Sequence, residues 1–100
     1  KFTNSKMKNP KISIITVVKN NKSYIEKNIL SLLSQKYKNY EHIIIDGGST
    51  DGTLEIIDKY KKSISSFVSE KDQGIYYAMN KGIEKSNSSF ILFMNNAVRK

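Results

Sequence analysis

The sequence contains no cysteine, and none of its apolar runs is long. Without cysteine the chain has neither a disulfide framework nor a thiolate metal site, which is typical of a protein from a reducing compartment. The longest apolar runs are about five residues, whereas a membrane span needs about 20. No apolar signal-peptide core follows the basic start. We therefore expect a cytoplasmic protein without a transmembrane helix.

Acidic residues are scarce, since 9 Asp and Glu stand against 17 Lys and Arg and the net charge is +8. This balance favours anionic partners such as nucleotides and permits peripheral contact with the inner face of a membrane. The lysines are spread along the whole chain and are not clustered with arginine, so we expect no nucleic-acid partner. A basic nucleic-acid-binding domain is the alternative, and its affinity would fall steeply with salt.

The length of 100 residues allows one small domain. We interpret residues 1–10 as an N-terminal arm and residues 11–100 as one folded unit. The segment that begins at Met7 reads like a natural start, so we expect residues 1–6 to be foreign to the protein.

Buried strands alternate with amphipathic helices along the chain. The apolar, β-branched run 12–18 predicts a strand buried on both faces of a parallel sheet. Ser23 and Glu26 form a capping-box pattern, which predicts a helix that continues to Gln35. The remaining predicted elements are strands 41–46, 63–70 and 90–94, a helix over 51–61, and a helix from about 75 to 83 capped by Asp72. The alternation predicts a three-layer α/β/α fold with a mainly parallel sheet of about four strands.

The polar segments that follow the predicted strands are the candidate ligand-binding positions, because open parallel sheets bind ligands at the carboxyl ends of their strands. Asp46 closes an apolar strand, where its carboxylate suits ribose hydroxyls or a base N–H; the alternative is a turn or helix cap. Gly47 and Gly48 allow positive φ and a close approach of ligand to backbone. The segment has no G-x-G-x-x-G pattern, so dinucleotide binding is poorly supported.

Several motifs in order carry a resemblance to a known family. The segments ISIITVVKNN, SLLSQKYKNYEHIIIDGGSTDGT and SEKDQGIYYAMNKGI resemble family-2 glycosyltransferases, especially those of bacterial polysaccharide synthesis. The resemblance extends from Lys11 to Met94. It implies a GT-A fold, in which a Rossmann-like half holds a nucleotide-diphosphate sugar and a later half binds the acceptor. Residues 11–100 would be the nucleotide-sugar-binding half, ending before the acceptor half.

The same resemblance implies which residues bind the nucleotide sugar. The turn after the first strand would line the base and ribose, Asp46 would accept hydrogen bonds from the nucleotide, and the segment before the third helix would lie beside the donor. The implied nucleotide-sugar-binding residues are Val17, Val18, Lys19, Asn20, Asp46, Gly47, Asp72 and Gly74. We assign Asn80 and Gly82 to helix packing.

The chain departs from the family pattern at three places. Lys19 stands where the family often has Tyr, and its cation suits phosphate. Tyr77 replaces an Asp. The family also implies a divalent cation, Mg²⁺ or Mn²⁺, held by an acidic D-x-D-like motif after the fourth strand, but residues 95–98 are NNAV. Asn95 offers one neutral carbonyl, which is a poor ligand for a cation that prefers anionic oxygens.

The resemblance implies an inverting glycosyltransferase that moves a sugar from a nucleotide-diphosphate donor, most often a UDP-sugar, to a saccharide or lipid-linked acceptor. We expect no catalytic residue in this chain, because the family's general base comes from the acceptor half, and we expect the fragment to be inactive alone. The alternative is a non-catalytic nucleotide-binding or interaction domain. We also expect self-association through an unpaired sheet edge, and a structural role for His42, the single histidine.

Overall fold

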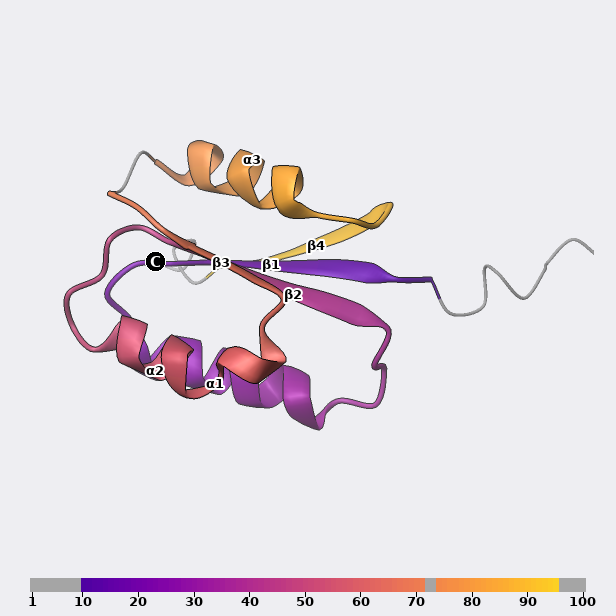
Figure 1. The fold of residues 1–100 in the computed structure, drawn as a ribbon, viewed down its shortest axis with the longest axis horizontal. Helices are drawn as coiled ribbons and strands as arrows, with labels where there is room; N and C mark the ends of the chain where they lie inside the picture. Colours follow the sequence, from indigo (N-terminus) through magenta and orange to yellow (C-terminus); the bar gives the residue numbers. More distant parts are fainter. Residues whose placement is uncertain (1–9, 72–73, 96–100) are drawn as a thin grey trace, which may run out of the picture.

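A four-stranded parallel sheet lies between two layers of helices in the computed structural model, which describes residues 10–71 and 74–95 (Figure 1). The strand order is β3-β2-β1-β4. Helices α1 and α2 cover one face and α3 covers the other, which confirms the predicted three-layer α/β/α fold. The elements are β1 (Ile12–Val18), α1 (Lys22–Ser34), β2 (Tyr40–Asp46), α2 (Thr53–Lys59), the 3₁₀ turn η2 (Lys61–Ser63), β3 (Ser66–Ser69), α3 (Ile75–Lys85) and β4 (Phe90–Asn95).

The third strand is shorter than predicted. Of the residues predicted to start this strand, Ser63 ends η2, and residues 64–65 precede β3. Ser63 N–H donates to the Tyr60 carbonyl at 2.9 Å, and Ile64 N–H donates to the Lys61 carbonyl at 3.2 Å. Helix α2 also begins later than residue 51, because Gly52 has a φ of 105°, which is incompatible with a right-handed helix.

The predicted capping box of α1 is wrong. The N-cap is Asn21, whose Oδ1 accepts a hydrogen bond from Tyr24 N–H at 3.2 Å. Glu26 does not turn back to the helix start. It accepts a hydrogen bond from the Tyr60 hydroxyl at 2.7 Å and pairs with Lys59 at 3.5 Å, so it joins α1 to the end of α2.

The hydrophobic core has one part on each face of the sheet. Toward α1 and α2, Ile44 of β2 packs with Ile25 and Ile29 of α1. Toward α3, Ile15 of β1 packs with Ile43 of β2, and all of these side chains are at most 1% exposed. This confirms that the apolar runs 12–18 and 41–46 form strands buried on both faces.

Helix α3 approaches the sheet closely at Gly82. A Cβ added to Gly82 would lie 2.5 Å from Cγ2 of Ile15 and 3.1 Å from its Cδ1. No real side chain tolerates the first distance, so the glycine sets the spacing between α3 and β1. The packing role assigned to Gly82 is therefore confirmed, whereas Asn80 is exposed and does not pack.

The single histidine lies in a buried polar network between the sheet and α1. The Thr16 hydroxyl donates to Asn28 Oδ1 at 2.8 Å and lies 2.8 Å from His42 Nε2. Because the hydroxyl has one proton and gives it to Asn28, Nε2 of His42 must be the donor in its own bond. Burial lowers the pKa of His42 to about 4, so the ring is neutral at pH 7.

The outer strand β4 is apolar on both faces. Phe90, Ile91 and Leu92 are 47%, 37% and 51% exposed. The self-association expected through this sheet edge depends on these side chains and stays a prediction. Within the described residues, none of the helices is long and apolar enough to span a bilayer.

Gly82→Ala should destabilise the chain by about 1 kcal/mol or more, because overpacking against Ile15 outweighs the better helix propensity of alanine. Asn80→Ala, at an exposed position of the same helix, should leave the free energy of unfolding unchanged or slightly raised. Urea unfolding of the two variants measures this. A Gly82→Ala variant more stable than the parent would contradict the close contact.

Acid should destabilise the chain through His42. The folded pKa lies near 4, below the ordinary value of 6.5, so the unfolded chain binds the proton more tightly. This contribution to stability is complete above pH 6.5 and is lost as the pH falls toward 4, with a loss of about 2 kcal/mol between pH 7 and pH 5. Urea unfolding should show this loss in the parent and not in His42→Gln. If NMR showed that the His42 ring titrates near pH 6.5, the predicted lowering of its pKa by burial would be refuted.

Candidate functional site

The carboxyl ends of the parallel strands meet at one edge of the sheet. Val18 pairs with Asp46, and Asp46 pairs with Ser69 of β3. On the other side of β1, Val17 pairs with Asn95 of β4. Because β1 lies between β2 and β4, the strand order reverses here, which is where open α/β sheets bind ligands. The structure thus places four backbone positions of the predicted site together, while the side chain of Asn95 lies outside the described part.

The Asp46 carboxylate organises the loop that follows β2. The residue is 1% exposed. Its Oδ2 accepts hydrogen bonds from Gly48 N–H at 2.9 Å, Ser49 N–H at 2.8 Å and the Ser69 hydroxyl at 2.9 Å. Its Oδ1 accepts the Ser49 hydroxyl at 2.5 Å. Of the two interpretations of Asp46, this geometry matches the turn cap, and a nucleotide contact stays a prediction.

Asn20 connects the loop after β1 to the loop after β2. Its backbone has a φ of 48°, in the left-handed region where asparagine is one of the few tolerated residues. Asn20 N–H donates to the Ser49 hydroxyl at 2.8 Å, and Asn20 Oδ1 accepts from Thr50 N–H at 2.7 Å. The two loops that flank the switch point therefore form one hydrogen-bonded unit.

Asp51 fastens the same unit to the starts of both helices. Its Oδ1 accepts from the N–H and hydroxyl of Thr53, at 3.0 and 2.5 Å, and its Oδ2 accepts from Lys22 N–H at 3.3 Å. The hydrogen bond from the Thr53 hydroxyl is the main reason that the pKa of Asp51 lies below its ordinary value. The N-cap of α2 is Gly52, and Asp51, one residue earlier, links the starts of the two helices.

The two glycines after Asp46 differ in their roles. Gly48 has a φ of 88°, and an added Cβ would lie 3.4 Å from the carbonyl oxygen of Glu70. Gly47 has no positive φ, so the expectation of a left-handed backbone is wrong there. Its N–H donates to the Val18 carbonyl at 2.9 Å and continues the pairing of β1 with β2.

The other predicted ligand residues differ in their access to a ligand. The Val18 side chain is 2% exposed and belongs to the core. Lys19 is exposed after β1. Gly74, with a φ of 101°, is the N-cap of α3. Asp72, predicted to cap α3 and to lie beside the donor, falls outside the described residues.

Tyr77 takes part in a cluster that the sequence did not reveal. Its hydroxyl donates to Glu70 Oε1 at 3.2 Å, and Lys81 lies 3.6 Å from Glu70 Oε2 and 5.4 Å from the centre of the Tyr77 ring. The hydrogen bond with Tyr77 and the charge of Glu70 raise the pKa of Lys81. The residue that replaces the family's Asp thus joins α3 to the end of β3.

The described carboxylates at this edge do not fit a divalent cation. The oxygens of Asp46 and Asp51 accept hydrogen bonds from the loops, and a cation would have to displace those donors. Across residues 10–71 and 74–95, no group of three or more His, Cys, Asp or Glu could hold a metal ion. We therefore derive no step through Mg²⁺ or Mn²⁺.

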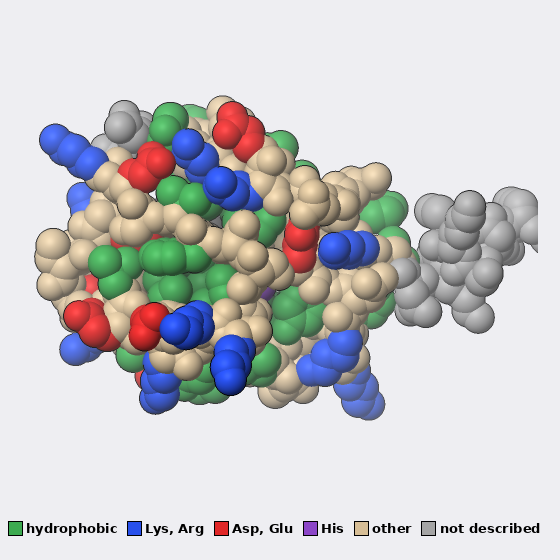
Figure 2. Space-filling view, in the orientation of Figure 1, with side chains coloured by type: hydrophobic (Ala, Val, Ile, Leu, Met, Phe, Trp, Pro, Cys, Tyr) green, Lys and Arg blue, Asp and Glu red, His purple; other side chains and the backbone are tan. Residues whose placement is uncertain are grey.

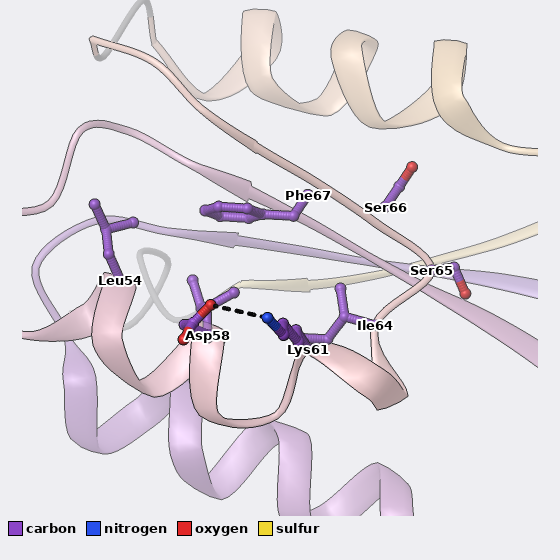
Figure 3. A pocket seen from close by; sticks show the side chains of 8 residues that line it. Leu54, Asp58, Lys61, Ile64, Ser65, Ser66 and Phe67 are labelled. Carbon is purple, nitrogen blue, oxygen red and sulfur yellow. Dashed lines mark ion pairs between the residues drawn. The ribbon is translucent and has the colours of Figure 1, made fainter.

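A pocket of about 250 Å³ lies elsewhere, between α2 and the start of β3 (Figure 3). Leu54, Ile57, Ile64 and Phe67 form its apolar lining, and the Asp58–Lys61 ion pair, 3.9 Å long, lies at its rim. Figure 2 shows this apolar area on the surface. The pocket adjoins η2 and not the carboxyl edge, so it is distinct from the predicted nucleotide site.

The fold and this edge define an α/β domain of the nucleotide-binding type, with two loops held together at a strand-order switch point. Residues 13–96 match the family model for glycosyl transferase family 2. The chain belongs to this family.

Two curated relatives share this similarity over most of the chain. An uncharacterized glycosyltransferase of Haemophilus influenzae is 41% identical over 92 residues, which cover 89% of this chain and 37% of the relative. A Bacillus subtilis protein named for teichuronic acid biosynthesis, TuaG, is 35% identical over 89 residues. These residues cover 86% of this chain and 35% of TuaG. The chain therefore spans little more than a third of these relatives.

Solved structures confirm the GT-A fold. The mannosyltransferase PcManGT of Pyrobaculum calidifontis, in complex with GDP-Man and Mn²⁺, has a TM-score of 0.78 at 20% identity over 86% of this chain and 27% of its own. TarS of S. aureus, residues 1–349 with UDP-GlcNAc, has a TM-score of 0.70 at 26% identity over 85% of this chain and 26% of its own.

Asp46→Asn should destabilise the chain by about 2 to 4 kcal/mol, because the amide removes the charge and presents N–H groups to the loop donors. Asp58→Asn is the matched control, since the Asp58 side chain is 76% exposed. It should change the free energy of unfolding by less than about 0.5 kcal/mol. Equal unfolding midpoints of the two variants in urea would show that the Asp46 contacts are dispensable.

Proposed function

We propose that this chain is the donor-binding half of an inverting glycosyltransferase and holds the nucleotide of a nucleotide-diphosphate sugar at the carboxyl edge of the sheet. The observation that carries the proposal is the hydrogen-bonded unit of the two loops around Asp46 and Asn20. Membership of the family and the likeness to TarS with UDP-GlcNAc support a nucleotide-sugar ligand. The nucleotide that we propose for this donor is UDP.

The exposed residues of the two loops are the proposed contacts. Lys19 and Asn20 follow β1, and Lys19 brings a cation that suits the diphosphate. Asp46 acts first by shaping the loop. Its Oδ1 accepts one hydrogen bond, from Ser49, but the residue is 1% exposed, so a base N–H or a ribose hydroxyl would reach this oxygen only if the loop opened. Gly74, without a side chain at the start of α3, leaves room for the donor sugar.

In the proposed reaction an acceptor hydroxyl attacks the anomeric carbon from the side opposite the diphosphate. The new bond joins the acceptor oxygen to that carbon, the bond from carbon to diphosphate oxygen breaks, and a general base takes the hydroxyl proton. The exposed acids Glu55, Asp58 and Glu84 lie on the helices, and none is assigned this role. We propose that the base and the acceptor site belong to the part of the relatives that this chain does not span.

The proposed acceptor is a saccharide or a lipid-linked saccharide in polysaccharide synthesis. The relative named for teichuronic acid biosynthesis supports this class. The chain alone should have no transferase activity, because it supplies donor contacts without a base.

UDP at millimolar concentration should shift the amide resonances of residues 19–20 and 48–50 in a ¹H–¹⁵N spectrum. Lys19→Ala should weaken this binding about threefold to tenfold, because it removes the cation proposed to face the diphosphate. Lys62→Ala removes one charge on η2, away from this edge, and should leave the affinity unchanged. If UDP moved no amide near Asp46, or if the two variants lost affinity equally, the proposed site would be wrong.

A further inference from the structure

We propose that the outer side of α1, with the turn that follows it, is a docking surface for an anionic phospholipid bilayer. We call this the α1 surface and define it by Lys27, Leu30, Leu33, Lys36 and Lys38. None of the proposed nucleotide-sugar-binding residues belongs to this surface. The proposal is independent of the nucleotide site, since α1 meets that edge only through its first residues.

The α1 surface exposes two large apolar side chains. Leu30 is 45% exposed and Leu33 is 41% exposed, whereas Ile25 and Ile29 on the inner side of the helix are at most 1% exposed. Leu30 and Leu33 are three residues apart, so they are neighbours on the helix. An amphipathic helix that lies in a bilayer interface inserts such side chains just below the headgroups.

The charge of this segment is of one sign. Residues 27–40 contain three lysines and no Asp or Glu. Lys27, Lys36 and Lys38 are all exposed. Lysine side chains lie along the lower margin of the molecule in Figure 2, the side on which both α1 and α2 lie in Figure 1. Each lysine close to an anionic membrane surface adds to the attraction.

The acidic residue nearest in the helix is neutralised within the fold. Glu26 pairs with Lys59 and accepts the Tyr60 hydroxyl. These contacts hold the pKa of Glu26 below its ordinary value, with the Tyr60 hydrogen bond as the main cause. The carboxylate is therefore bound to α2 and adds little repulsion toward an anionic surface.

A bilayer suits this surface better than an acidic protein partner. The surface is convex, because it is the outer side of a helix, and the residues that define it are two leucines and three lysines, with no aromatic anchor among them. Protein interfaces depend on such anchors. A bilayer needs only shallow apolar insertion and diffuse positive charge.

The test is co-sedimentation of the chain with vesicles of equal parts phosphatidylglycerol and phosphatidylcholine, at 150 mM salt, against vesicles of phosphatidylcholine alone. The parent should bind the anionic vesicles and not the neutral ones. Leu30→Ser should lower the affinity about fivefold, and Lys27→Glu about tenfold or more.

Matched controls lie on α3, across the sheet. Ile83 is 44% exposed, so Ile83→Ser removes a comparable exposed side chain, and Lys85→Glu changes the net charge as much as Lys27→Glu does. Both controls should bind within twofold of the parent. Circular dichroism should show that all four variants keep the fold. The proposal is overturned if the parent does not bind, if Leu30→Ser binds like the parent, or if Lys85→Glu weakens binding as much as Lys27→Glu.

Discussion

The buried carboxylate of Asp46 is the interaction on which the carboxyl edge of the sheet depends. A charge that is 1% exposed is tolerated only when donors surround it, and here two backbone N–H groups and two hydroxyls do so. One of those hydroxyls, of Ser49, also accepts from Asn20 N–H. Ser49 therefore joins the loop after β2 to the loop after β1. A ligand therefore meets an edge whose backbone is already ordered, which lowers the entropic cost of binding.

The regular elements could be predicted from the sequence because their patterns are strong. Runs such as 12–18 and 43–45 have apolar side chains on both faces, so strands covered on both sides accommodate them. Long-range partners could not be predicted in this way. Glu26 matched a capping box, but the Tyr60 hydroxyl, 34 residues away, binds it in the fold. In the same way, nothing in the sequence links Tyr77 to Glu70 or Asp46 to Ser69, since these pairs meet only once the sheet has formed.

The sequence predicted where in the sheet the candidate site lies, and the binding roles of its residues stay predictions. Asp46 and Asn20 lie at the switch point, as the family resemblance implies. The resemblance gave no role to Ser49, although its hydroxyl joins both loops. The chain belongs to glycosyl transferase family 2, and the donor role of this edge is our proposal. The chain spans little more than a third of its curated relatives.

Amide hydrogen exchange of the free chain tests most directly whether Asp46 orders this edge. The N–H groups of Gly48 and Ser49 lie in a loop, where amides normally exchange fast, but both donate to the Asp46 carboxylate. If Asp46 orders the edge, these two amides exchange at least about 100-fold more slowly than unstructured amides, close to the rates of β1 and β2. If the amides of Gly48 and Ser49 both exchanged at the rate of an unstructured chain, Asp46 would not order this edge.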